Sequence, residues 1–225
     1  MHTLAIVAGN NDPSNCNYLA NTFIEELKKN DVTVEKIRLK DMNLEHFSLK
    51  HYESDYEHEK NFKKIQSGME CATGVVIATP IWNFGVPANL KNLIDRMGSF
   101  ALDESRSKGT LNYKPFYFIF TGGAPLPAWK GLMKKTTSFV QEGLRYFGAS
   151  ITGTFFEGEC MLGRGKFGLV VDKRPERLNS LRKEATKFAK IVRTYEKTGK
   201  APIANRSKNS LMKIGETVLK KITGN

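Results

Sequence analysis

Short apolar segments alternate along the chain with segments in which apolar residues recur every three or four positions. Five short runs predict strands, and they cover residues 4–8, 32–37, 75–78, 116–120 and 151–156. Four stretches with helical spacing predict helices, within residues 19–27, 90–97, 139–147 and 175–195. Strands that alternate with helices are typical of a parallel sheet with helices on both faces. We therefore predict an α/β fold with a doubly wound, five-stranded parallel sheet in three layers, α/β/α.

Two regions depart from this alternation. Residues 39–60 are polar and rich in His, Glu and Tyr, which predicts a surface excursion between the second strand and the next helix. The end of the chain is basic and carries a short amphipathic pattern at Leu211, Ile214, Val218 and Ile222. A chain of 225 residues suits one sizeable core. We predict one domain over residues 1–198, followed by a basic amphipathic tail over residues 199–225.

Charge and cysteine content add little about the body of the domain. The formal net charge is +12, but seven Lys or Arg residues and only one acidic residue occur from Lys197 onward. Charge therefore gives no reason to expect a nucleic-acid partner. The three cysteines are scattered, with neither a disulfide framework nor a zinc-binding spacing, and no segment is long and apolar enough to span a bilayer. We expect a cytoplasmic protein.

The first candidate binding turn, residues 9–17, follows the first strand and leads into a helix. Unpaired backbone N–H groups and the positive dipole end of a helix start suit a phosphate. Ser14, Asn15 and Asn17 can add side-chain donors. The alternative interpretation is that Ser14 only caps the helix.

Two further turns follow the third and fourth predicted strands. Trp82 and Phe84 lie in a loop where a flat ligand could stack, although both rings could instead pack into the core. Gly122 and Gly123 allow the backbone to approach a ligand closely, although they could also form a simple tight turn. Because the carboxyl ends of parallel strands meet at one edge of the sheet, we expect all three turns to converge there.

The loop and helix after the third strand carry a specific resemblance. Residues 80–96, P-I-W-N-F-G-V-P-A-N-L-K-N-L-I-D-R, resemble the P-x-Y/W … P-A-x-L-K-x-x-I-D-R segment of the NADPH-dependent FMN reductase and NAD(P)H quinone reductase family, which includes azoreductases. The resemblance extends over roughly residues 3–156. It implies a flavodoxin-like fold, bound FMN and a homodimer or tetramer.

The resemblance also implies roles for individual residues. The phosphate would be held by Ser14, Cys16 and Asn17. The isoalloxazine ring would be lined by Pro80, Ile81, Trp82, Asn83 and Phe84, and its other side covered by Thr121, Gly122 and Gly123. Asn10 and Asn15 complete the cofactor-binding candidates in the first turn.

Two further features bear on the site. Asp12 disfavours a nearby phosphate unless its carboxylate points away. His46, His51 and His58 lie in one polar stretch, but their spacing is irregular, so we expect a solvated loop and no metal site.

The resemblance, which agrees with the convergence of the three turns, implies an FMN-dependent oxidoreductase that passes electrons from NADPH or NADH through FMN to a small acceptor, such as a quinone, a free flavin, or an azo or nitro compound. The cofactor carries this chemistry, so we expect no catalytic acid or base from the protein. The alternatives are a flavodoxin-type electron carrier and a non-enzymatic flavin-binding or regulatory domain on the same fold. We expect the tail to contact a second subunit in preference to a membrane surface.

Overall fold

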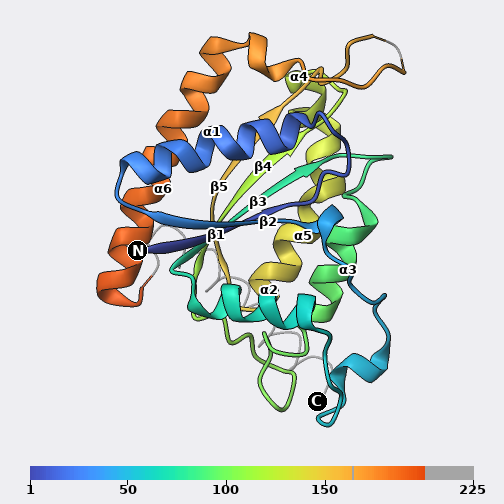
Figure 1. Cartoon of the computed structure of the whole chain (residues 1–225), viewed down its shortest axis with the longest axis vertical. Coiled ribbons are helices and arrows are strands. Elements are labelled where there is room, and N and C mark those ends of the chain that lie inside the picture. The colour runs from blue at the N-terminus through green and yellow to red at the C-terminus, as the bar shows by residue number, and fades with distance from the viewer. Residues whose placement is uncertain (164, 201–225) are drawn as a thin grey trace, which may run out of the picture.

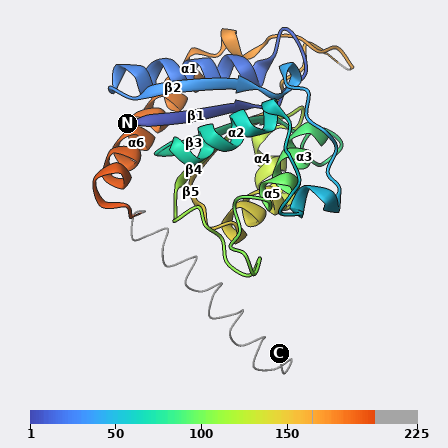
Figure 2. The ribbon, with the colours of Figure 1, turned by 60° about the horizontal axis from the view of Figure 1, so that its bottom comes forward.

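The computed structural model describes residues 1–163 and 165–200, and in them five strands form one parallel sheet. The strands are β1 (His2–Val7), β2 (Thr33–Arg38), β3 (Gly74–Pro80), β4 (Pro115–Thr121) and β5 (Ser150–Glu157). Their order is β2-β1-β3-β4-β5, which can be followed in Figure 2. This is the flavodoxin-like arrangement, and the predicted fold class is confirmed.

Helices cover both faces of the sheet. Figure 1 shows α1 (Asn15–Lys29) and α6 (Pro175–Thr198) on one face, and α2 (Lys60–Cys71), α3 (Ala88–Met97) and α5 (Lys134–Tyr146) on the other. Before α5 come the short α4 (Leu126–Ala128) and a π-helical turn, η3 (Trp129–Met133). Three 3-10 turns complete the elements: η1 (Leu39–Asp41), η2 (Leu49–Tyr52) and η4 (Val171–Lys173).

Strand side chains divide the core into two parts. In β1, Leu4 and Ile6 pack with α2 and α3, whereas Ala5 and Val7 pack with α1 and α6. This follows from the two-residue period of a strand. Every residue of β4 is buried, as expected for an inner strand of a sheet covered on both faces.

The excursion at residues 39–60 is more ordered than the sequence predicted. His51 is fully buried, and the solvated loop predicted there is wrong at this residue. Its ring packs edge-on to Tyr56, with 4.8 Å between the ring centroids. The same excursion also contacts a fully buried Arg96 on α3, whose guanidinium forms a bidentate ion pair with Glu59 and donates to the Glu45 carbonyl at 3.2 Å. The excursion is therefore fastened to α3.

The described chain ends just after α6. Gly199 adopts a left-handed conformation with φ of 60°, and its N–H donates to the carbonyl of Tyr195. Glycine accepts this conformation without a side-chain clash, which suits it to the end of a helix. The amphipathic segment predicted in the tail lies outside the described residues. No described helix combines the length and apolar character needed to cross a membrane.

Candidate functional site

A cavity of about 230 Å³ lies where the chain leaves the carboxyl ends of β1, β3, β4 and β5. The strand order reverses between β1 and β3, the usual ligand position in such sheets. Eleven of the thirteen predicted cofactor-binding residues line the cavity: Asn10, Ser14, Asn15, Cys16, Pro80, Ile81, Trp82, Asn83, Thr121, Gly122 and Gly123. Asn17 and Phe84 are not among the lining residues.

The first turn places the start of α1 against the cavity. Ser14 is the N-cap: its hydroxyl accepts a hydrogen bond from the Asn17 N–H at 3.3 Å. The same hydroxyl lies 3.3 Å from the Cys16 sulfur, and both side chains are buried. A capped helix still has unpaired N–H groups in its first turn. Ser14 thus caps the helix, as the alternative interpretation held, and the helix end also borders the cavity.

Asp12 is turned away from the cavity. Its carboxylate accepts hydrogen bonds from Arg38 at 2.6 Å and pairs with Lys40 at 2.9 Å. These hydrogen bonds from Arg38 and Lys40 lower the pKa of Asp12 below its usual value. Asp12 is not a lining residue, so its charge is neutralised outside the candidate site.

The three asparagines of the turn that were predicted to bind the cofactor have partners within the protein. The Asn15 amide donates to the Gly168 carbonyl at 2.7 Å, and its oxygen accepts from the Val170 N–H at 2.9 Å. Asn17 accepts from Lys36, and Asn10 accepts from the Asn89 amide at 2.9 Å. Asn15 therefore fastens the segment after β5 to the start of α1, a role that the sequence did not reveal.

A tight turn shapes the second loop. Trp82 and Gly85 exchange two backbone hydrogen bonds of 2.9 Å, and the residues between them, Asn83 and Phe84, have φ of 47° and 65°. This turn leaves Phe84 65% exposed and outside the cavity lining, whereas Trp82 is 38% exposed and lines the cavity. Neither ring is in the core, and the two adjacent aromatics differ in their relation to the site.

The glycine loop after β4 packs against the segment after β5. The Gly122 N–H donates to the Glu157 carbonyl, and the Gly122 carbonyl accepts from the Cys160 N–H, both at 3.0 Å. A methyl group added at Gly123 would lie 3.0 Å from the Met161 sulfur, so this close approach favours glycine. The fourth wall of the cavity therefore comes from the segment after β5.

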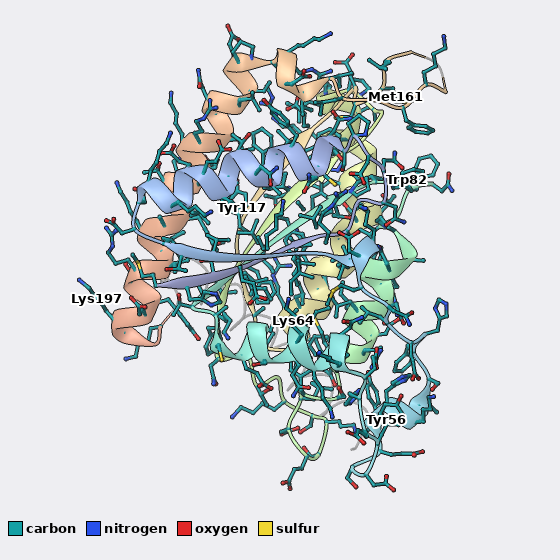
Figure 3. All side chains as sticks on the ribbon, in the orientation of Figure 1. Tyr56, Lys64, Trp82, Tyr117, Met161 and Lys197 are labelled. Carbon is teal, nitrogen blue, oxygen red and sulfur yellow. The ribbon has the colours of Figure 1, made fainter. Side chains whose placement is uncertain are left out.

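The sequence predicted the three turns after β1, β3 and β4 but not the wall formed by the segment after β5. This segment contributes Cys160, Met161, Phe167 and Gly168 to the lining. Phe167 stacks on Trp82, with 5.5 Å between ring centroids and 21° between ring planes. Figure 3 labels Met161 of this wall, and Trp82 lies on the same side of the molecule, below Met161 in the view. The only local signal was a glycine-rich basic stretch at residues 163–166, in which Gly163 and Lys166 are exposed.

The described residues that line the cavity are uncharged. Within residues 1–163 and 165–200, no Asp, Glu, Lys or Arg belongs to the lining. Burial raises the pKa of the Cys16 thiol and raises that of Cys160 to about 12, so both remain protonated at neutral pH. Nearby, the buried Glu157 carboxylate pairs with Arg174 and Arg177, each at 2.7 Å. No group of His, Cys, Asp and Glu suited to a metal ion occurs in the part of the chain that the structure describes.

Comparison with known proteins agrees with this architecture. The model of the family described as NADPH-dependent FMN reductase matches residues 1–130. The FMN-dependent NADH:quinone oxidoreductase of Ruminiclostridium cellulolyticum is 30% identical over 137 residues, which span 57% of this chain and 59% of that protein.

Two solved structures resemble the fold over most of its length. The NAD(P)H:quinone oxidoreductase from Methanothermobacter marburgensis has a TM-score of 0.67 at 18% identity, over 82% of this chain and 97% of that one. An FMN-dependent NADH-azoreductase from Bacillus anthracis, in complex with FMN, has a TM-score of 0.61 at 18% identity, over 84% and 99%. At 18% identity, these similarities show a shared fold and nothing more.

Proposed function

The chain belongs to the NADPH-dependent FMN reductase family, and from this premise we propose that it is an FMN-dependent NAD(P)H oxidoreductase. It takes electrons from NADH or NADPH and passes them to a small acceptor such as a quinone, a free flavin, or an azo or nitro compound. The observation that carries the proposal is that the turns after β1, β3 and β4, each a candidate binding turn on the sequence, border one cavity together with the segment after β5.

The residues present fit FMN. The phosphate is dianionic near neutral pH, and the lining residues that the structure describes carry no carboxylate that would repel it. Asp12, the nearest acidic residue of the first turn, is paired with Arg38 and Lys40. The start of α1 supplies backbone N–H groups and the positive end of a helix dipole. These features favour a phosphate in the first turn.

Each wall would have a distinct role. Ser14, Cys16 and the backbone of the first turn of α1 would hold the phosphate. Pro80, Ile81, Trp82 and Asn83 would line one side of the isoalloxazine ring, with Thr121, Gly122 and Gly123 on the other. FMN, when bound, supplies the chemistry of hydride and electron transfer. The chain would bind and orient the cofactor, and its two buried thiols, whose pKa values are raised by burial, stay protonated at neutral pH.

We propose further that the protein is cytoplasmic and works as a homodimer or tetramer. The free thiols at Cys16, Cys71 and Cys160 favour a reducing compartment. The tail, residues 199–225, is proposed to contact a second subunit, because its amphipathic pattern is too short to be stable alone. Membrane-surface contact and nucleic-acid binding are not part of the proposal.

Titration with FMN and riboflavin tests the proposal at the phosphate. We expect FMN to bind at least about tenfold more tightly, because charge-assisted hydrogen bonds to a phosphate are strong. The variant Ser14→Asp keeps a good N-cap residue but adds a negative charge. It is expected to weaken FMN binding much more than riboflavin binding. Equal affinities for the two flavins in the unmodified protein contradict the assignment of the phosphate to the first turn. If the FMN-loaded protein does not oxidise NADH or NADPH, the proposed oxidoreductase activity is contradicted.

A further inference from the structure

The Trp82–Phe167 pair lies at the exposed rim of the cavity. Trp82 is 38% exposed and Phe167 is 60% exposed, whereas Ser14, Cys16 and Thr121 on the inner walls are buried. A ligand that arrives after the cofactor meets the rim first. The rim of this cavity therefore presents an aromatic surface to the second ligand.

The two rings are in direct contact. Their centroids are 5.5 Å apart and their planes differ by 21°, within the range of a stacked aromatic pair. A third ring does not fit between rings in contact. A planar molecule can reach this face of Trp82 only when Phe167 has moved off it.

The backbone beside Phe167 is fixed, but its ring is free to turn. The Asn15 amide holds the next residue, Gly168, by a hydrogen bond of 2.7 Å to its carbonyl. Before it, the Lys166 N–H donates to the Gly163 carbonyl at 3.0 Å. Exposed side chains change rotamer within nanoseconds, so the Phe167 ring can leave Trp82 without movement of its backbone.

We propose that Phe167 is a specificity-determining residue that competes with planar acceptors for the face of Trp82. It covers this face when no acceptor is bound, and it turns away when a planar aromatic acceptor stacks on Trp82. Acceptors that do not stack are insensitive to it. This inference rests on the proposed function, since it concerns the acceptor of the same site.

Steady-state kinetics of the FMN-loaded enzyme test the competition. The probes are anthraquinone-2-sulfonate, which is planar, and ferricyanide, which is octahedral and cannot stack. Phe167→Ala is expected to raise kcat/KM for anthraquinone-2-sulfonate by about two- to twelvefold, the equivalent of one lost stacking contact. The value for ferricyanide is expected to stay unchanged.

Matched variants control for a general effect on the loop. Phe84→Ala removes an equally exposed ring that does not line the cavity, and it is expected to leave both values unchanged. Phe167→Trp keeps a stacking ring and is expected not to raise either value. An unchanged or lower kcat/KM for anthraquinone-2-sulfonate in Phe167→Ala overturns the proposal, and so does an equal rise with ferricyanide. Tighter FMN binding in Phe167→Ala also overturns it, because the competition would then be with the cofactor.

A second readout needs neither flavin nor turnover. The chain has two tryptophans, and Trp129 is 5% exposed, so acrylamide quenching of the flavin-free full chain reports mainly on Trp82. Phe167→Ala is expected to raise the quenching constant, and Phe84→Ala is not. A constant unchanged in Phe167→Ala overturns the inference even if the protein proves not to be a reductase. Turnover of neither acceptor by the unmodified enzyme counts against the proposed function instead.

Discussion

Two halves of one continuous sequence signature have different tasks in this molecule. Residues 80–83 line the cavity. Later in the same signature, Asn92 accepts from the Phe47 N–H at 2.7 Å and donates to the Glu45 carbonyl at 2.9 Å, and Arg96 forms its ion pair with Glu59. The first half therefore lines the cavity, and the second half fastens the 39–60 excursion to α3. Polar residues that recur in a signature need not be ligand residues.

Arg96→Met is the change with the largest expected effect. It removes a fully buried guanidinium that also lies over the Phe62 ring, 4.1 Å from its centroid, and it leaves Glu59 unpaired. We expect a loss of about 3 kcal/mol in the free energy of unfolding, the low end for breaking a buried pair, because Glu59 keeps 21% of its side chain exposed. Urea denaturation measures the loss.

The control for Arg96 lies on the same helix. Lys91→Met removes an exposed ion pair with Asp95, which is expected to change stability by at most about 0.5 kcal/mol. FMN affinity of the folded Arg96→Met protein is expected to stay within about twofold of the unmodified value, since Arg96 is not a lining residue. An FMN affinity that is tenfold weaker in Arg96→Met contradicts the conclusion that the second half of the signature is structural only.

The same ion pair predicts a dependence on pH. Burial of Glu59 favours its neutral form, but hydrogen bonds from Arg96 and from the backbone of Glu59 and Glu45, with the charge of Arg96, together outweigh burial and lower the pKa of Glu59 to about 2. An unfolded glutamate titrates near about 4.3, so the pair stabilises the fold above that pH. This contribution is lost as the pH falls from about 4.3 towards 2. Urea midpoints at pH 5 and pH 3 are expected to differ more in the unmodified protein than in Glu59→Gln; equal differences contradict the assigned role.

Trp82→Phe tests the other half of the signature. The side chain is partly exposed, so the free energy of unfolding is expected to change by less than about 1 kcal/mol. Addition of FMN is expected to quench the fluorescence of the unmodified protein, and most of that quenching is expected to disappear in the variant. Quenching that persists undiminished shows that Trp82 is not near the flavin ring.

The sequence was most informative where the signal is local. The apolar run at residues 116–120 lies within β4 (Pro115–Thr121), because a strand buried on both faces must be apolar throughout. The helix predicted at residues 175–195 is α6 (Pro175–Thr198), because its apolar side follows the helical period. Convergence of the three turns followed from the parallel sheet alone.

Long-range contacts could not be predicted in this way. Asn15 is satisfied by backbone groups of Gly168 and Val170, more than 150 residues later, and no local pattern encodes such a partner. Phe167 follows a glycine-rich basic stretch, and it reaches Trp82 only because the segment after β5 returns to the cavity. The buried His51 likewise lies in an excursion that Arg96, in another element, contacts through the Glu45 carbonyl.

Asp12→Asn is expected to have the smallest effect, and it contrasts an exposed ion pair with the buried one at Arg96. The Asp12 side chain is 57% exposed and pairs with Arg38 and Lys40. Exposed pairs contribute little to stability because water and salt screen them, so the urea midpoint is expected to stay within experimental error. The substitution does leave two cations without their shared anion beside the first turn.

Loss of the Asp12 charge makes the electrostatic potential at the start of α1 more positive, and this favours a dianionic phosphate bound there. FMN affinity of Asp12→Asn is therefore expected to rise by at most about threefold at low salt, and the rise is expected to vanish at 0.5 M salt, where the screening length is only about 4 Å. Riboflavin affinity, without the phosphate charge, is expected to stay unchanged and serves as the control. A rise that survives high salt shows a direct contact with the cofactor in place of a field effect, and a fall in FMN affinity shows that the Asp12 pair shapes the turn that holds the phosphate.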